Sequence, residues 1–260
     1  MLFSWKKNRT KKKFFLNKNN YDLLAELREK GIANKNNDDL VEELREKGIT
    51  DKNILNAIKK VPRELFVNKL SSQLAYENMP LPVECGQTIS QPYVVAYMID
   101  CLKLKKTDKV LEIGTGTGYQ TAIISYLCQK IYTIEIFDKL FHQAKLNINK
   151  LKIRNVIHKH DNGINGWGEE ILFDAIIISA ASEEISSKML KNLKNYGKLI
   201  FPKKYPSENQ KLILVKKKGE NNFEKEELFD VKFVPLLNKI LKIKYEKTYY
   251  HLRQSSRSWF

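Results

Sequence analysis

From Lys109 onward, short apolar runs alternate with stretches of helical spacing. Each run has the length of a strand, and residues 119–127, between the first two runs, have helical spacing. This alternation predicts a mostly parallel sheet covered by helices on both faces. A ligand is then expected at the carboxyl ends of the strands. The apolar runs lie at residues 110–113, 131–134, 173–179, 198–201 and 211–215.

The pattern upstream of these runs predicts helices. The stretch Glu-Leu-Arg-Glu-Lys-Gly-Ile occurs at residues 26–32 and again at 43–49, each copy having the form of a helix end closed by a glycine. Two copies are too few for a solenoid, so we expect a duplicated helix whose second copy leads into the domain. A further helix is expected over 51–70, where Pro62 interrupts the pattern, and residues 1–20 are expected to be disordered.

Composition narrows the class of protein. The 260 residues, of which 42 % are hydrophobic, suffice for one large α/β domain. Three cysteines without a Cys-x-x-Cys pair predict a reducing compartment, with neither a disulfide framework nor a metal site. No apolar run approaches the roughly 18 residues of a membrane-spanning helix, and the basic residues follow the short apolar start instead of preceding it, unlike a signal peptide. We therefore expect a cytoplasmic protein without membrane contact.

The net charge of +16 is the one unusual bulk property. Positive charge attracts nucleic acids and anionic membranes non-specifically. Lysine is used along the whole chain, however, and only a clustered patch or stripe indicates nucleic-acid binding. Compositional drift is the favoured interpretation, and nucleic acid is not an expected partner.

A glycine-rich loop follows the first apolar run. Residues 114–118 have the sequence Gly-Thr-Gly-Thr-Gly and open into the predicted helix, whose free N–H groups favour anionic ligands. Dinucleotide enzymes have Gly-x-Gly-x-x-Gly here, but the third glycine comes one residue early and Tyr119 stands in its place. A Walker loop is excluded because no Gly-Lys-Ser/Thr follows. The spacing favours S-adenosylmethionine, with expected contacts from Glu112, Gly114, Gly116 and Gly118.

Polar side chains follow the second and third predicted strands. Glu135 ends the second, where a carboxylate can accept hydrogen bonds from both ribose hydroxyls; a solvated strand-end charge is the alternative. Asp161 or Asn162 follows the third and is a candidate partner for the adenine amino group. The alternative there is an ordinary turn, because Asp-Asn-Gly is strong turn chemistry.

Residues 86–93, Gly-Gln-Thr-Ile-Ser-Gln-Pro-Tyr, precede the nucleotide-binding pattern. Ser90 is suited to cap a helix whose first turn contains Pro92. The pattern by itself predicts only a capped helix. The segment resembles protein-L-isoaspartate O-methyltransferases, and so do, in the family's order, residues 61–67, 75–77, 81–82, 110–116, 166–167, 173–177 and 233–236.

This resemblance, over roughly residues 40–236, implies a Rossmann-like class I methyltransferase fold: a doubly wound, mostly parallel α/β sheet with an N-terminal helical region. It implies methyl transfer from S-adenosylmethionine to the free α-carboxylate of L-isoaspartyl, and to a lesser extent D-aspartyl, residues in damaged proteins. It also implies a monomer. Ser90 is the implied catalytic residue, and the implied substrate contacts are Thr88, Ile89, Ser90, Val234 and Leu236.

The chain departs from the family pattern at several positions. Asn162 stands where the family has an acid, Tyr196 replaces a glycine, and Lys203 begins a pair of lysines where Val-Gly is common. The expected organisation is a basic extension with a partly duplicated helix over 1–40, a helical and substrate-binding region over 41–107, the methyltransferase domain over 108–236 and a basic aromatic tail over 237–260. Two alternatives stay open: a methyltransferase acting on RNA or another substrate, and a non-catalytic binding module.

Overall fold

The computed structural model describes residues 35–168, 170–238, 241–243 and 245. The first copy of the helix repeat, the expected disorder over 1–20 and most of the basic tail lie outside the described residues. These described residues form one unit by their contacts. The boundary expected at residue 107 therefore concerns function within this unit and stays a prediction.

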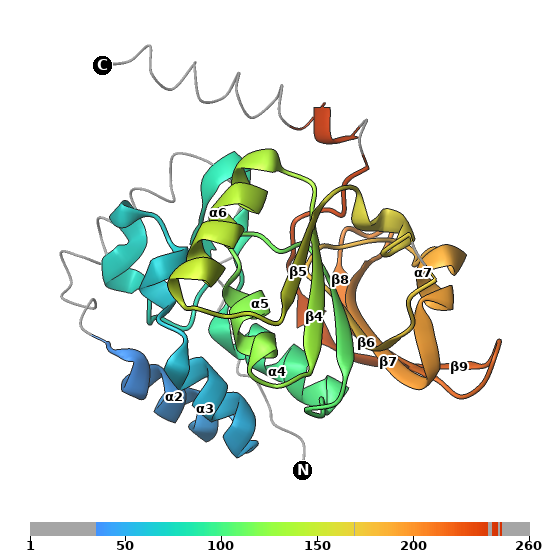
Figure 1. Ribbon diagram of the computed structural model, residues 1–260, viewed down its shortest axis with the longest axis horizontal. Helices are drawn as coiled ribbons and strands as arrows, with labels where there is room; N and C mark the ends of the chain where they lie inside the picture. The colour runs from blue at the N-terminus through green and yellow to red at the C-terminus, as the bar shows by residue number, and fades with distance from the viewer. Residues whose placement is uncertain (1–34, 169, 239–240, 244, 246–260) are drawn as a thin grey trace. The chain divides into compact units, whose positions relative to one another are not determined.

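A seven-stranded sheet with the order β5-β4-β3-β6-β7-β8-β9 forms the centre of this unit (Figure 1). The strands from β5 to β7 are parallel, whereas β7–β8 and β8–β9 are antiparallel pairs. The mostly parallel sheet expected from the apolar runs is confirmed. The strands are β3 (Lys109–Ile113), β4 (Lys130–Glu135), β5 (Val156–His160), β6 (Phe173–Ile178), β7 (Leu193–Lys204), β8 (Gln210–Lys217) and β9 (Phe223–Val231).

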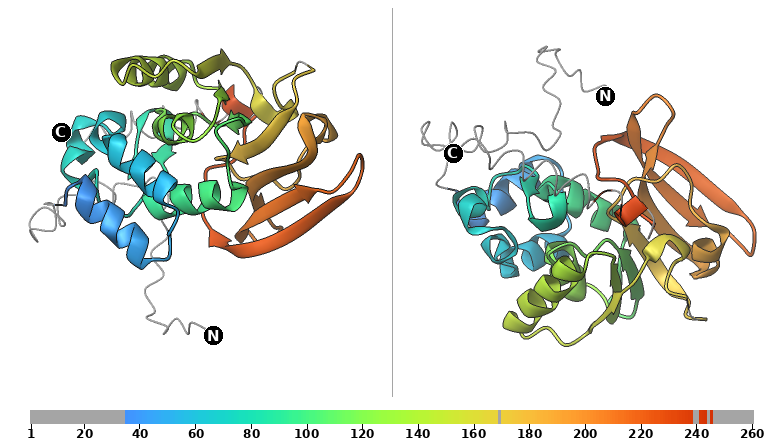
Figure 2. Two further views of the ribbon diagram at one scale, coloured as in Figure 1. Left: turned by 60° about the horizontal axis from the view of Figure 1, so that its bottom comes forward. Right: turned by 90° about the horizontal axis from the view of Figure 1, so that it is seen from above.

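Helices cover both faces of the sheet (Figures 1 and 2). Neighbouring residues of β3 show the two faces, because successive side chains of a strand point in opposite directions. Leu111 packs in a core cluster with Met189 of α7, whereas Glu112 points toward α5 on the other side. The helices are α2 (Asn37–Glu46), α3 (Lys52–Lys60), α4 (Pro92–Leu102), α5 (Tyr119–Ser125), α6 (Asp138–Lys150) and α7 (Ser187–Lys191).

The second copy of the helix repeat forms α2. Asn36 caps it through a reciprocal arrangement: its side chain accepts from the N–H groups of Asp38 and Asp39, and the Asp39 carboxylate accepts from the Asn36 N–H. Gly48, with φ of +94°, follows the end of the helix. This is the glycine-closed helix end that the repeat predicted.

The single helix expected over 51–70 is wrong. Helix α3 ends at Lys60, because Val61 is extended before Pro62, as residues preceding proline usually are. Two short 3-10 turns, Arg63–Phe66 and Lys69–Leu74, complete the segment. The turns place Arg63 in the interior, which matters for the site below.

Among the described residues, no helix is long and apolar enough to cross a membrane.

Candidate functional site

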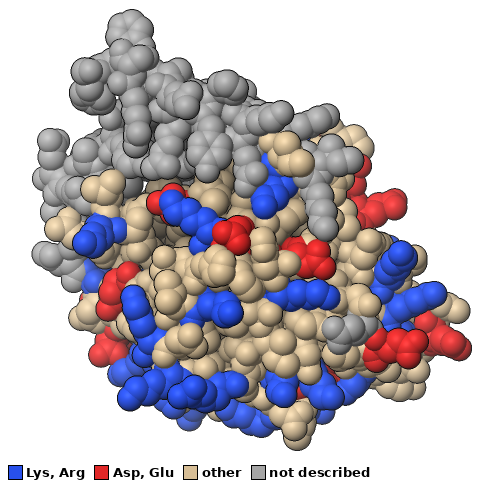
Figure 3. All heavy atoms as spheres, turned by 45° about the horizontal axis from the view of Figure 1, so that its top comes forward, with Lys and Arg blue, Asp and Glu red and all other residues tan. Residues whose placement is uncertain are grey.

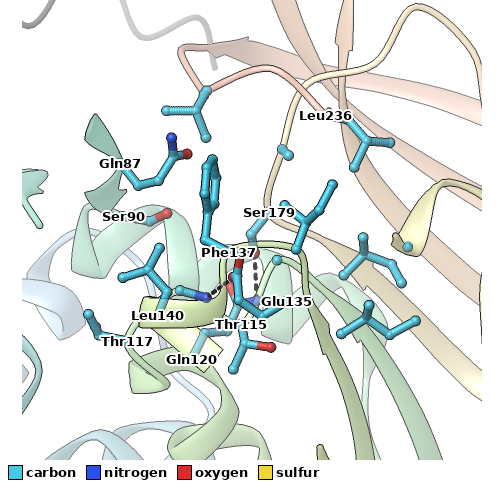
Figure 4. Close-up of a pocket in the computed structure, with 18 of the residues that line it drawn as sticks. Gln87, Ser90, Thr115, Thr117, Gln120, Glu135, Phe137, Leu140, Ser179 and Leu236 are labelled. Carbon is cyan, nitrogen blue, oxygen red and sulfur yellow. Dashed lines mark hydrogen bonds between the residues drawn. The ribbon is translucent and has the colours of Figure 1, made fainter. Parts of the chain in front are cut away.

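A pocket lies at the carboxyl ends of β3, β4 and β6, where the strand order reverses on either side of β3. Such a switch point is the usual ligand site of an open α/β sheet. The space between its walls, open solvent at the mouth included, amounts to about 830 Å³. Its walls come from the glycine loop, the β4–α6 loop, the segment around β2 (Thr88–Ile89) and residues 234–237 (Figure 4).

The glycine loop has the backbone conformation that its sequence requires. Gly114, Gly116 and Gly118 all have positive φ, which side chains rarely tolerate. Gly114 and Gly116 line the pocket. Gly118 caps α5 instead, and a Cβ there would lie 3.4 Å from the Cβ of Ala144 in α6. It shapes the loop without facing the pocket.

Glu135 lies in the pocket wall at the end of β4 and is only 5 % exposed. Its carboxylate accepts hydrogen bonds from the N–H groups of Gly116, at 2.7 Å, and Phe137, at 2.9 Å. Burial raises its pKa to about 7, and these backbone hydrogen bonds oppose the shift. Each oxygen keeps further acceptor capacity for a ligand hydroxyl.

The structure separates the two candidate adenine partners. Asp161 lines the pocket, and its backbone N–H donates to the carbonyl of Glu135. Asn162 is not part of the pocket lining; its side chain accepts from the N–H of Ile164 and caps the 3-10 turn Gly163–Asn165. The turn chemistry anticipated for Asp-Asn-Gly is therefore present at Asn162.

Glu112 is also not part of the pocket lining. It is fully buried beneath the glycine loop, where its carboxylate accepts hydrogen bonds from Gln120, Thr121 and Thr133. Burial raises its pKa, and these three donors oppose the rise. The expected direct contact between Glu112 and the cofactor is not what this geometry provides; the carboxylate instead holds the residues around the loop.

Ser90 lines the pocket from the side opposite Leu236 (Figure 4). The prediction that Ser90 caps a helix is wrong: α4 is capped at Gln91, without a side-chain hydrogen bond, and Pro92 occupies the first turn. The serine hydroxyl is thus not committed to the helix end. Thr88 and Ile89, which pair with β1 (Leu81–Pro82), also line the pocket.

The segment around Pro235 forms the wall near the end of β6. Its backbone is held by Ala181, whose N–H donates to the carbonyl of Val234 at 2.8 Å and whose carbonyl accepts from the N–H of Leu236 at 2.7 Å. These bonds bring Val234 and Leu236 into the pocket lining. The five residues implied as substrate contacts thus converge on the same pocket as the glycine loop.

Several lining residues were not anticipated, and the polar side chains of Gln120 and Ser179 are among them. Ser179 directly follows β6, and residues after parallel strands meet at one edge of a sheet, so the register could have indicated it. Gln120 has no comparable sequence pattern. Among the residues that the structure describes, no group of three or more His, Cys, Asp or Glu is arranged to hold a metal ion.

Comparisons with known proteins identify the family of this chain. The model of the protein-L-isoaspartate(D-aspartate) O-methyltransferase family matches residues 34–241. The chain belongs to this family. A protein-L-isoaspartate O-methyltransferase of Parvibaculum lavamentivorans is 43 % identical over 191 residues, which are 73 % of this chain and 86 % of that protein. One from Dictyoglomus thermophilum is 45 % identical over 183 residues, 70 % of this chain and 82 % of the relative.

Solved structures of the isoaspartate methyltransferase family share the fold. One superposes with a TM-score of 0.72 at 29 % identity; the match covers 78 % of this chain and 66 % of that one. Another, from Plasmodium falciparum and in complex with S-adenosyl-L-homocysteine, has a TM-score of 0.69 at 28 % identity and covers 78 % of this chain and 99 % of that one. The Rossmann-like methyltransferase fold implied by the sequence is confirmed.

Proposed function

We propose that the chain transfers a methyl group from S-adenosylmethionine to the free α-carboxylate of L-isoaspartyl, and less readily D-aspartyl, residues in damaged proteins. The observation that carries this proposal is the convergence of two elements on one pocket. The glycine loop and Glu135, which are suited to bind a nucleoside, line the same pocket as Ser90 and its neighbours. Family membership gives the reaction class, and methyl transfer from S-adenosylmethionine to isoaspartyl carboxylates is the function that this geometry supports best.

The residues present fit S-adenosylmethionine. Glu135 is a buried carboxylate with unused acceptor capacity, suited to the two ribose hydroxyls. A Cβ on Gly116 would meet nothing within 4 Å, so the main chain there is open to close approach by a ligand. Asp161 is the proposed partner of the adenine amino group. When bound, the cofactor supplies a methyl group on a sulfonium, which is a good leaving group.

The acceptor needs little activation from the protein. A carboxylate with an ordinary pKa of about 3.5–4 is ionised at neutral pH and requires no general base. Catalysis can then come from in-line positioning, for which effective molarity contributes up to about 7–11 kcal/mol. We assign Ser90 the role of orienting one carboxylate oxygen. Thr88, Ile89, Val234 and Leu236 are the proposed contacts of the peptide around it.

Paired peptides that differ only in an aspartyl or isoaspartyl linkage test the function. With methyl-labelled S-adenosylmethionine, base-labile label is expected on the isoaspartyl peptide alone. Base-stable label on RNA would support the alternative methyltransferase, which the comparisons do not favour. Absence of cofactor binding by calorimetry would support a non-catalytic module. Equal labelling of both peptides, or of neither, would overturn the proposal.

Charge gives no separate support for nucleic acid as a partner. Lysines and arginines gather along the lower border of the face in Figure 3, but acidic side chains are interspersed over the rest of it. On β8 and β9 the two signs pair directly, as in Lys211–Glu227 and Lys216–Glu226. We therefore propose damaged proteins as the partners. We also propose that the protein is a monomer, which sedimentation tests, and that it is located in the cytoplasm, which cell fractionation tests.

A further inference from the structure

Ser179 is a pocket residue to which the proposed function gives no role. It directly follows β6, and its backbone N–H donates to the carbonyl of Ile113 at 2.9 Å, which fixes it beside the glycine loop. A Cβ on Gly114 would lie 3.6 Å from the Cβ of Ser179. The serine therefore lies on the β3–β6 side of the pocket, whereas Glu135 marks the β4 side (Figure 4).

A hydrogen-bonded chain from the interior orients the Ser179 hydroxyl. The Gln120 side-chain amide donates one hydrogen to Ser179 Oγ, at 2.8 Å, and the other to Glu112 Oε1, at 2.9 Å. Both amide hydrogens are then used. Ser179 Oγ is the acceptor in this pair, so its own proton is free to be donated elsewhere.

Glu112 fixes the orientation of the Gln120 amide. A buried carboxylate is an acceptor, so the amide must turn its NH₂ group toward Glu112. The second carboxylate oxygen accepts from Thr121 and Thr133. Because Thr133 donates to Glu112, the hydroxyl of Thr115 in the glycine loop must donate to Thr133, at 2.6 Å. One buried carboxylate thus organises both the loop and, through Gln120, the Ser179 side of the pocket.

The position of Ser179 selects the ligand chemistry. If the ribose and adenine lie toward Glu135 and Asp161, the amino-acid end of the cofactor and the acceptor meet on the β3–β6 side. Both of these groups carry a carboxylate. A hydroxyl whose oxygen already accepts a hydrogen bond is suited to donate to such a group, and hydrogen bonds to charged groups are the stronger ones.

We propose that Ser179, oriented by Gln120 and Glu112, donates a hydrogen bond to a carboxylate bound in the pocket. The carboxylate belongs either to the amino-acid end of the cofactor or to the methyl acceptor. The inference rests on the proposed function. The binding experiment described below uses the cofactor product without any peptide. A protein that bound this product but methylated no peptide would therefore contradict the proposed function and still allow the role of Ser179 in binding to be tested.

The test compares Ser179→Ala with Ser179→Thr and with the control Ser125→Ala. Ser125 is a buried serine whose hydroxyl donates to the carbonyl of Ala122 in α5, and it does not line the pocket. Titration calorimetry measures affinity for S-adenosylhomocysteine and for 5′-methylthioadenosine, which lacks the amino-acid end. Steady-state kinetics measure KM and kcat for an isoaspartyl peptide.

A cofactor contact predicts that Ser179→Ala weakens S-adenosylhomocysteine binding roughly tenfold or more and leaves methylthioadenosine within twofold. An acceptor contact predicts unchanged affinity for both nucleosides and a similar rise in peptide KM. In either case Ser179→Thr, which keeps a hydroxyl, should have an affinity or KM close to that of the wild type, and Ser125→Ala should resemble the wild type. Gln120→Met keeps the side-chain length but loses the donor. It should change the same quantity, cofactor affinity or peptide KM, by less than Ser179→Ala does.

Three outcomes would overturn the proposal. Equal weakening of both nucleosides would show that the alanine variant disturbs the pocket wall as a whole. Failure of Ser179→Thr to restore the affected parameter would exclude the hydroxyl as the cause. Unchanged affinities and unchanged KM in a folded Ser179→Ala protein would show that Ser179 contacts neither carboxylate.

Discussion

The guanidinium of Arg63 donates a hydrogen bond to the backbone carbonyl of Ser90, at 3.1 Å. Arg63 is completely buried and donates in addition to the carbonyls of Ala75, Glu77 and Met79. Burial lowers its pKa to about 10, so it stays charged at neutral pH. One cation therefore holds two segments of backbone together: residues 75–79 and the segment of the catalytic candidate Ser90.

Arg63→Lys tests this arrangement. An ammonium on a flexible stem cannot reproduce the planar fork that reaches four carbonyls. We expect a loss of about 2–4 kcal/mol in the free energy of unfolding, since each buried carbonyl left unpaired costs about 1–3 kcal/mol. We also expect a higher KM for the isoaspartyl peptide, with S-adenosylhomocysteine affinity within twofold. Arg45→Lys is the exposed control, for which chemical denaturation should show a change below about 0.5 kcal/mol.

Ser90→Ala removes the hydroxyl proposed to orient the acceptor. A hydrogen bond to a charged group is worth about 1.5–3 kcal/mol, so kcat/KM for the isoaspartyl peptide should fall about 10–150-fold. Cofactor affinity should stay unchanged. The control is Ser72→Ala, an exposed serine whose hydroxyl donates to the carbonyl of Lys69. Full activity of Ser90→Ala would remove the proposed role.

How far the sequence predicts this structure depends on burial. The inner strands were predictable because strands buried on both faces are continuous apolar runs, as in β6. Strand β9 was not anticipated, because it is an edge strand rich in exposed charges that pair with lysines of β8. Its register comes from the partner strand, not from its own pattern.

The site shows the same limit. Glu135 was identifiable because the local pattern places it at the end of a strand, and Ser90 because its segment resembles the family's signature. The roles of Glu112 and Ser179 were not, since they depend on which strands are neighbours. Glu112 lies in β3, and Ser179 directly follows β6, the parallel strand beside β3 that is far from it in sequence. Only the fold shows that Gln120 lies between them.

Glu135 makes cofactor binding depend on pH. Its native pKa is about 7, against an ordinary value of 4.5, so the native state binds its proton more tightly than the unfolded chain. In the free protein its contribution to stability therefore declines as pH rises from 4.5 through 7. Ribose hydroxyls that donate hydrogen bonds to Glu135 favour its ionised form over its protonated form. Cofactor binding should therefore release a proton from Glu135 and strengthen as pH rises toward 7.

Calorimetry of S-adenosylhomocysteine between pH 6 and 8, in buffers of different ionisation enthalpy, measures this proton release. Glu135→Gln is expected to bind more weakly and with no comparable pH dependence, because the amide does not titrate. His158 does not interfere, since burial lowers its pKa to about 4 and keeps it neutral in this range. A wild-type affinity that stays constant across the range would contradict the ribose role.

Gly163→Ala is expected to damage the pocket floor. A Cβ at this position would lie 2.5 Å from Cγ2 of Ile113, the last residue of β3. Ile113 is 2 % exposed and cannot move freely, so the variant should lose about 1–3 kcal/mol of stability by overpacking and bind the cofactor more weakly. Gly219→Ala is the matched control, because a Cβ there would meet nothing within 4 Å. Equal unfolding midpoints for the two variants would contradict this explanation.

Tyr196, where the family has glycine, is held in an unfavourable backbone conformation. Its φ is +64°, the left-handed region, and its side chain is 81 % exposed. That conformation costs an L-residue about 1–2 kcal/mol. Glycine avoids this cost, but it loses more conformational entropy on folding, which offsets part of the gain. Tyr196→Gly should therefore raise the free energy of unfolding by about 0.5–1 kcal/mol.

The matched variant is Tyr196→Ala, which removes the ring but keeps the Cβ and hence the strain. It should gain little, so the difference between glycine and alanine in chemical denaturation isolates the backbone effect from the loss of an exposed aromatic ring. Neither variant should change kcat/KM, because Tyr196 lies near the amino end of β7, away from the carboxyl-end pocket. Equal stability of the two variants would show that the left-handed backbone at Tyr196 carries no cost.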